Sequence, residues 1–259
     1  MNKKFIPKVI FKMAPIKIET NMLRYFTSEK NSRWIGLFEK RYPELLEELK
    51  KVKKAEEKSK VCENFAKKLH RKNKKIMVAF QTDIQNKWNK INDPFLKTLS
   101  NHFQTDWPEN KKEIVGYVSI LPVFPRFLDE YSFCLGYKNI DENIEVSAHE
   151  IVHFLWFKKW KEVFPEIKRS DYESPNLVWR LSEIIDQIIL QTEPKIKKLI
   201  KPEGWGYGSF KKIKIGKLSM TDHFLKKYLQ FLESEKDFGM VMKKLWKETQ
   251  KHEGKISSF

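Results

Sequence analysis

The stretch that decides the fold reads His149-Glu150-Ile151-Val152-His153. Two histidines four positions apart lie on one face of an α-helix, so both imidazole rings can reach a single metal ion. Residues 141–160 contain no Gly or Pro, which predicts one continuous helix. The central residues of that helix are apolar nearly all round, and such a helix is buried. Burying two imidazoles and a carboxylate costs several kcal/mol unless they are paired or bind metal.

Glu150 adds a second feature to the same turn. It follows the first histidine and points to the flank of the face that carries both rings, from where it can act as a general base on a water molecule. The five residues match the H-E-x-x-H signature of zinc metallopeptidases. The alternative is a pair of core histidines that bond to backbone groups. We favour metal binding because of the cost of burying these polar groups.

A third metal ligand has to come from downstream, because a catalytic zinc keeps three protein ligands and one open position. The extended signature with a third histidine fails here, since Trp156 and Lys159 stand at the required positions. A carboxylate on a second helix is the other option. Residues 174–191 predict that helix, and Ser174 and Pro175 suit its N-cap and its first position.

Two carboxylates lie in the most apolar part of this second helix, where isolated charges are rarely placed. We predict that Glu183 is the third ligand. Asp186 follows three residues later on the same face, and could hold a histidine ligand through its second ring nitrogen. Either carboxylate could instead face solvent. Three further acids lie in a polar connection and are weaker candidates for the third ligand: Glu162, Asp171 and Glu173.

With this third residue, the chain resembles the gluzincin branch of the zincin metallopeptidases. The resemblance rests on the H-E-x-x-H residues and on Glu183, 30 residues beyond His153, and covers about residues 113–235. It implies a zincin-like catalytic core, in which a small twisted sheet precedes the active-site helix and a further helix carries the glutamate. It also implies Zn²⁺ bound by His149, His153 and Glu183, with Glu150 as general base. The thermolysin-like pattern has Asp four residues after the glutamate, where this chain has Gln187.

The segment before the active-site helix predicts a small sheet. Residues 113–121 are rich in β-branched and aromatic side chains and residues 131–137 alternate, so both stretches favour strands. Tyr131–Tyr137 is our candidate for the strand that pairs with an extended peptide substrate, and a plain interior strand is the alternative. We expect a mainly helical N-terminal region over 1–110 and a metallopeptidase core with C-terminal helices over 111–259. The predicted fold class is α+β, mainly helical.

Several boundaries within the N-terminal region can also be predicted. Residues 8–19 favour a strand, and Pro43 suits the first turn of a long helix that ends near Lys72. A separate amphipathic helix follows over 76–91, and Asn92-Asp93-Pro94 breaks it before a further helix begins.

Two residues near the C-terminus are candidates for stabilising an oxyanion. Zincins commonly place a Tyr or His opposite the general base for this purpose. Tyr207 lies in the Gly-rich stretch 204–209, and His223 lies in a helix that Ser219 or Thr221 would cap. An ordinary loop or surface position is the alternative for each of them.

The composition sets wider expectations. The 51 Lys and Arg against 34 Asp and Glu give a net charge of +17, which can attract nucleic acid or anionic membrane. The lysines are spread along the whole chain without a compact basic motif, so we do not expect functional nucleic-acid binding.

Two cysteines give no disulfide framework. With no apolar run near the roughly 18 residues of a membrane span, and no signal-peptide core, we expect a soluble cytoplasmic protein. The oligomeric state stays open.

These observations predict a zinc-dependent peptidase that acts on a peptide or protein substrate. Zn²⁺ would lower the pKa of a water molecule to about 7, and Glu150 would take its proton. One alternative is a zincin-like protein that binds metal without proteolysis, as a regulator or scaffold, although the intact Glu150 argues against it. Another is a basic nucleic-acid-binding protein in which the signature occurs by chance.

Overall fold

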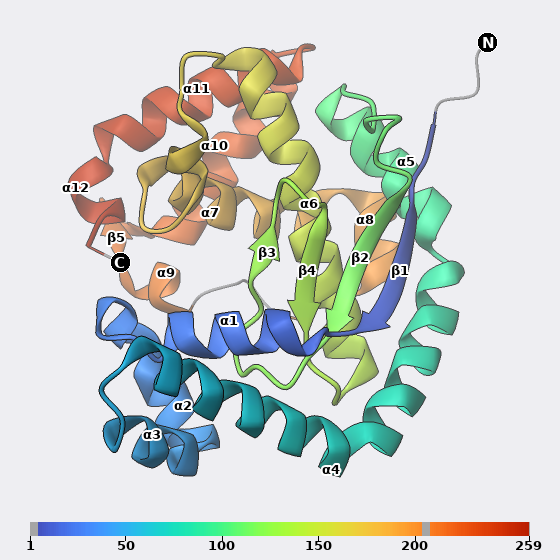
Figure 1. Ribbon diagram of the computed structural model, residues 1–259. Helices are drawn as coiled ribbons and strands as arrows, with labels where there is room; N and C mark the ends of the chain where they lie inside the picture. Colours follow the sequence, from blue (N-terminus) through green and yellow to red (C-terminus); the bar gives the residue numbers. More distant parts are fainter. Residues whose placement is uncertain (1–4, 204–207, 259) are drawn as a thin grey trace. The chain divides into compact units, whose positions relative to one another are not determined.

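Strand β1 (Lys8–Met13) pairs in parallel with β2 (Glu113–Val118), so the sheet joins segments that are far apart in the sequence. The computed structural model in Figure 1 describes residues 5–203 and 208–258. Contacts divide these residues into two units. The sheet unit contains Lys8–Lys90 and Glu113–Ser147; the helical unit contains residues 5–7, Ile91–Lys112 and the described residues from Ala148 onward. The sequence predicted one boundary near residue 110. The two units divide the chain differently, because the β1–β2 pairing places residues 8–90 in the same unit as residues 113–147.

The described strands of the sheet unit form one mixed sheet in the order β1-β2-β4-β3. Strand β4 (Ser132–Leu135) runs parallel to β2, and the short β3 (Arg126–Phe127) pairs with β4 in the antiparallel sense. Gly116 in β2 allows a close approach, because a Cβ at this position would lie 2.6 Å from Cδ1 of the Phe11 ring. Mainly helical with a small mixed sheet, the protein is α+β, as predicted.

Amide side chains of α4 (Ala55–Asn89) bond to the outer edge of β1. Gln85 Oε1 accepts a hydrogen bond from the Phe11 backbone N–H at 2.8 Å, and Gln85 Nε2 donates to the Val9 carbonyl at 3.1 Å. Gln81 Nε2 donates to the Phe11 carbonyl at 3.0 Å. An edge strand exposes backbone groups that can pair with another chain, and these bonds occupy them.

The other described helices of the sheet unit precede α4 in the sequence. They are α1 (Ile16–Phe26), α2 (Ile35–Arg41) and α3 (Pro43–Lys50), with a 3₁₀ segment at Glu29–Trp34. Glu19 on α1 is fully buried, and its oxygens accept from the Ser119 hydroxyl at 2.9 Å and from the Ile120 backbone N–H at 3.0 Å. A fully buried carboxylate needs such partners, and here they connect α1 to the end of β2.

The helical unit contains many of the described ring–ring contacts. Its elements are α5 (Asn92–Phe103), α6 (Ile140–Val163, from Ala148), η2 (Arg169–Tyr172), α7 (Leu177–Thr192), α8 (Pro194–Ile200), α9 (Gly208–Lys212), β5 (Lys214–Ile215), β6 (Leu218–Ser219), α10 (Met220–Ser234), α11 (Phe238–Lys251) and α12 (Glu253–Ile256). Phe103, Trp156 and Phe238 meet edge to face with centroids 5.1–6.5 Å apart, so α5, α6 and α11 share one core.

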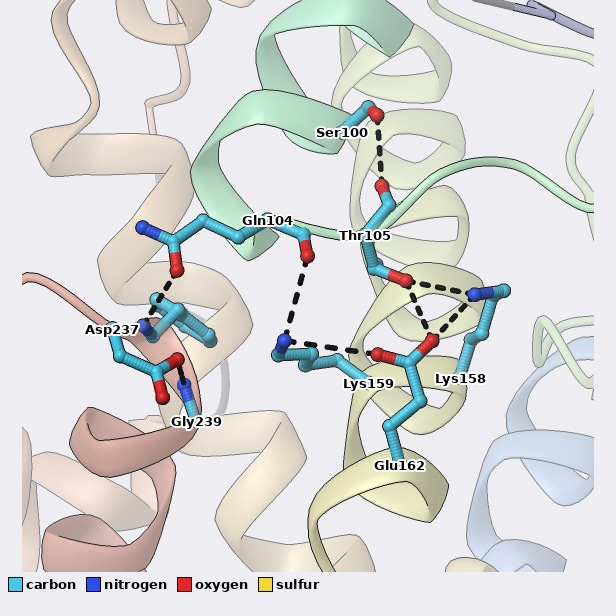
Figure 2. A network of polar contacts seen from close by, with 9 residues as sticks. Ser100, Gln104, Thr105, Lys158, Lys159, Glu162, Asp237 and Gly239 are labelled. Atoms are coloured by element: carbon cyan, nitrogen blue, oxygen red, sulfur yellow. Dashed lines mark hydrogen bonds and ion pairs between the residues drawn. The ribbon is translucent and has the colours of Figure 1, made fainter.

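A polar network holds the end of α5 against α6 and α11 (Figure 2). The Gln104 amide accepts from the Phe238 backbone N–H at 2.9 Å. Thr105 donates to Glu162 on α6 at 2.8 Å, and Lys158 donates to the same carboxylate oxygen at 2.5 Å. Glu162 is therefore a structural contact of α6 and not a third metal ligand.

The two helices expected to carry the metal ligands are confirmed as α6 and α7. The start predicted for α7 is wrong, because Asn176 stands at its N-cap and the helix begins at Leu177. Ser174 and Pro175 precede it. The two expected strands are present as β2 and β4. Within the stretch Tyr131–Tyr137, β4 lies between β2 and β3, and β3 covers Ser132 and Phe133, so these two residues have the interior place that was the alternative to a substrate-pairing edge.

The N-terminal region also departs from its predicted boundaries. The helix that begins at Pro43 ends at Lys50, and α4 starts afresh at Ala55 and runs through residue 76 to Asn89. The break over residues 51–54 consists of three exposed lysines and the half-buried Val52, so little of it is buried. The strand expected over 8–19 ends at Met13, and Pro15 begins the turn into α1.

Among residues 5–203 and 208–258, no helix combines the length and the apolar character needed to cross a membrane.

Candidate metal centre

Helix α6 supplies two imidazole rings on one face. His149 and His153 are one turn apart, and their Nε2 atoms lie 3.1 Å from each other. The His153 side chain is fully buried, and 14 % of the His149 side chain is exposed. The His153 ring stacks on Phe157 at a centroid distance of 5.9 Å, and Phe157 stacks on Tyr172. This packing fixes the direction in which the His153 ring points.

Glu183 on α7 completes a set of three donors, as predicted from its apolar surroundings. Its Oε2 lies 3.2 Å from His149 Nε2, and its Oε1 lies 3.4 Å from His153 Nε2. For a tetrahedral zinc ion with bonds of about 2.0–2.2 Å, two ligand atoms stand roughly 3.3–3.5 Å apart. The three donors are therefore arranged close to the spacing of a zinc site, and their chemistry, two imidazoles and one carboxylate, fits that ion.

Asp186 stands behind the second histidine. Its Oδ2 lies 2.6 Å from His153 Nδ1, and both side chains are fully buried. A proton on His153 Nδ1 would face this carboxylate, and the lone pair of Nε2 would then face the other donors. The sequence predicted that Asp186 supports a histidine, and the structure places it against His153.

Gln187 has the corresponding place behind the first histidine, and sequence reasoning missed it. Its Nε2 lies 3.0 Å from His149 Nδ1. If His149 presents Nε2 to a metal, its Nδ1 carries a proton and needs an acceptor. The two ends of an amide are interchangeable by a half turn, and Gln187 Oε1 has no hydrogen-bond partner among the described residues. The turned amide would therefore accept the His149 proton at no cost in other bonds.

Opposite charges in the cluster stabilise each other. Burial lowers the pKa of His149, but the Glu183 carboxylate, with Glu150 and Asp186, outweighs that effect and raises the pKa to about 9. Burial would raise the pKa of the Glu183 carboxyl, but the rings of His153 and His149 hold it well below its ordinary value. Three buried acidic side chains thus favour positive charge at the point where the donors meet.

Glu150, the residue predicted to be the general base, follows His149 on α6. Its side chain is buried next to His149 on α6, and its charge acts on the His149 ring. It contributes no donor atom to the group formed by His149, His153 and Glu183.

The remaining candidates lie elsewhere. Tyr207 falls outside the described residues. His223 contacts Glu248 and His252 instead of the His149 cluster, so the structure does not bring it to the general base. Two of the weaker ligand candidates belong to the η2 region, where Glu173 pairs with Arg169 at 2.7 Å and Asp171 accepts from Ser170.

Searches of protein-family models, of curated proteins and of solved structures find no significant match to this chain.

Proposed function

We propose that the protein is a zinc-dependent peptidase with a zincin-like catalytic core. The observation that carries the proposal is the convergence of His149 Nε2 and His153 Nε2, 3.1 Å apart, on the Glu183 carboxylate, whose Oε2 lies 3.2 Å from the first nitrogen and whose Oε1 lies 3.4 Å from the second. A zinc site with three protein ligands keeps an open position for water, which is the arrangement of catalytic rather than structural zinc. The nearby Glu150 then supplies the base that hydrolysis needs.

The residues of the cluster have different roles in the proposed reaction. His149, His153 and Glu183 would hold Zn²⁺, which supplies a water of lowered pKa and a positive charge for the developing oxyanion. Glu150 takes a proton from the water as it attacks the peptide carbonyl carbon, and returns it to the leaving amine as the C–N bond breaks. Asp186 and Gln187 keep the two rings oriented for the whole cycle.

The burial of the cluster supports catalysis over simple charge pairing. Glu183, His153 and Asp186 are 3 % exposed or less, so their electrostatic interactions act in a medium of low polarity. Only His149 among the three donors is partly exposed, at 14 %. A substrate would therefore approach from the His149 side of the cluster.

Replacement of Glu150 tests the proposal. Glu150→Gln removes the proton acceptor and none of the three donors, so zinc content should stay at the wild-type value while hydrolysis of a fluorescently labelled unfolded protein falls by a factor of about 10² to 10⁴. The matched control is Glu142→Gln, an exposed residue in the first turn of the same helix, which should keep both properties.

Two results would contradict the proposal. One is wild-type hydrolysis by Glu150→Gln, which would exclude Glu150 as the base. The other is a wild-type protein that binds zinc at the His149 cluster and cleaves none of a broad set of unfolded and peptide substrates, which would favour a regulator or scaffold.

A further inference from the structure

A second group of imidazole and carboxylate side chains lies between α10 and α11 in the helical unit. His223 Nε2 is 2.9 Å from Glu248 Oε1, and His252 Nε2 is 3.3 Å from the same oxygen. All three ligand atoms lie within 4.8 Å of one another. The rings of His223 and His252 cross at 84° with their centroids 5.1 Å apart. Two rings and one carboxylate thus point at one small volume.

The sequence builds this cluster from the two ends of a helical hairpin. Ser219 caps α10, with its hydroxyl oxygen accepting from the Asp222 backbone N–H, and His223 follows in the first turn. A short connection joins α10 to α11, so the start of α10 meets the end of α11. Glu248 and His252 are four residues apart and share a face at that end.

The burial of the cluster suits a bound ion, although the positive charges of Lys227 and Lys251 also act on it. The side chains of His223, Glu248 and His252 are 14 %, 8 % and 25 % exposed, so the carboxylate is nearly buried while water can reach the rings. Lys251 Nζ lies 3.1 Å from Glu248 Oε2 and occupies that oxygen, which leaves Oε1 facing both rings. The Lys251 side chain is 59 % exposed and can move away from an incoming cation.

We propose that His223, Glu248 and His252 form a second divalent-metal site, independent of the His149 cluster, that binds Zn²⁺ and ties the start of α10 to the end of α11. Two imidazoles and one carboxylate select borderline transition ions such as Zn²⁺ over Mg²⁺ or Ca²⁺, which prefer all-oxygen sites. Water would complete the coordination on the exposed side. The proposal does not rest on the peptidase function.

Zinc stoichiometry tests the second site directly. Calorimetric titration of the full chain with ZnCl₂ alone should give about two equivalents, and His252→Ala or Glu248→Gln should each give about one. Glu253→Gln is the matched control, because Glu253 is an exposed carboxylate next to His252, and it should keep two. A stoichiometry that His252→Ala and Glu248→Gln both leave unchanged would overturn the proposal.

A second series separates this site from the His149 cluster. The double variant His149→Ala/His153→Ala should still bind about one equivalent of zinc, and adding His223→Ala should weaken that binding at least tenfold. If the double variant does not fold, the same question is answered in the native background, where His223→Ala should leave any hydrolysis of an unfolded protein intact while one equivalent is lost. Complete loss of zinc in a folded His149→Ala/His153→Ala variant would overturn the second site and leave the proposed peptidase untouched.

Discussion

The carboxylate of Glu183 on α7 lies between the imidazoles of His149 and His153 on α6. Its surroundings on α7 are mostly apolar, and 3 % of the Glu183 side chain is exposed. If it is a ligand, Glu183→Ala removes one of three protein bonds to zinc. We expect zinc affinity to fall at least a hundredfold, measured by competition with a chromophoric chelator. Glu173→Ala should leave the affinity unchanged, because Glu173 is exposed and pairs with Arg169. Equal losses in both variants would argue against coordination by Glu183.

The Nδ1 atoms of His153 and His149 contact Asp186 and Gln187, respectively. Because a carboxylate and an amide differ in strength as partners, we expect unequal losses of zinc affinity when each is replaced. Asp186→Ala should weaken zinc binding roughly 10- to 100-fold, because a buried carboxylate orients His153. Gln187→Met keeps the length of the side chain but removes the acceptor for His149, and should give a smaller loss, up to about tenfold. Gln191→Met is the control, since that amide bonds to the Pro202 carbonyl. An affinity unchanged in both test variants would exclude a supporting role.

Residue chemistry explains how much of the cluster could be predicted. His149, His153, Glu183 and Asp186 stand out in the sequence because charged or imidazole groups are costly among apolar residues. Gln187 does not stand out, because an amide is ordinary on any helix face. Its only signal is its place one turn after Glu183. The partnership of His223 with Glu248 and His252 depends on how α10 meets α11, and no local pattern reports that.

At the scale of elements, the packing of the sheet leaves no room for a side chain at position 116. A Cβ there would meet the Phe11 ring at 2.6 Å and Phe133 at 3.2 Å, and both rings are buried. Gly116→Ala should therefore lower the free energy of unfolding by about 1–3 kcal/mol, measured by urea denaturation. Gly36→Ala in α2 has no atom within 4 Å of the new Cβ and should be neutral or stabilising by up to about 1 kcal/mol. If Gly116→Ala lowered the free energy of unfolding less than Gly36→Ala does, the ring of Phe11 would have to move aside for the new Cβ.

Element boundaries were predicted where one local rule dominates and missed where contacts decide. An apolar stretch without Gly or Pro gives α6 its length, and β-branched residues give β2 its strand. By contrast, α4 continues through residues 73–75 to Asn89, and its Gln81 and Gln85 bond to β1, a contact that no periodicity reveals. The interior place of β4 follows from its pairing with β3, and a strand's own alternation does not say how many partners it has.

At the scale of the molecule, the division into units follows long-range strand pairing rather than composition. The parallel pairing of β1 with β2 places the first strand in the same unit as residues 113–147. A parallel pair needs a long connection, and here that connection is the run of helices from α1 to α5. The candidate metal cluster, by contrast, draws every donor from α6 and α7 within the helical unit, and these donors could be proposed from the spacing of the histidines and the apolar surroundings of Glu183.

Because the donors of the candidate site come from two helices of one unit, bound zinc should stabilise the folded chain. At a free zinc concentration 100 times the dissociation constant, binding to the folded state contributes about 2.7 kcal/mol. For a chain of this size that corresponds to a Tm shift of about 5–10 °C. The double variant His223→Ala/His252→Ala isolates the contribution of the His149 cluster. A chelator should lower its Tm by this amount, and added Zn²⁺, but not Mg²⁺, should restore it, because imidazole donors do not suit Mg²⁺. A Tm that stays constant while elemental analysis confirms zinc removal would mean that the ion does not bridge α6 and α7.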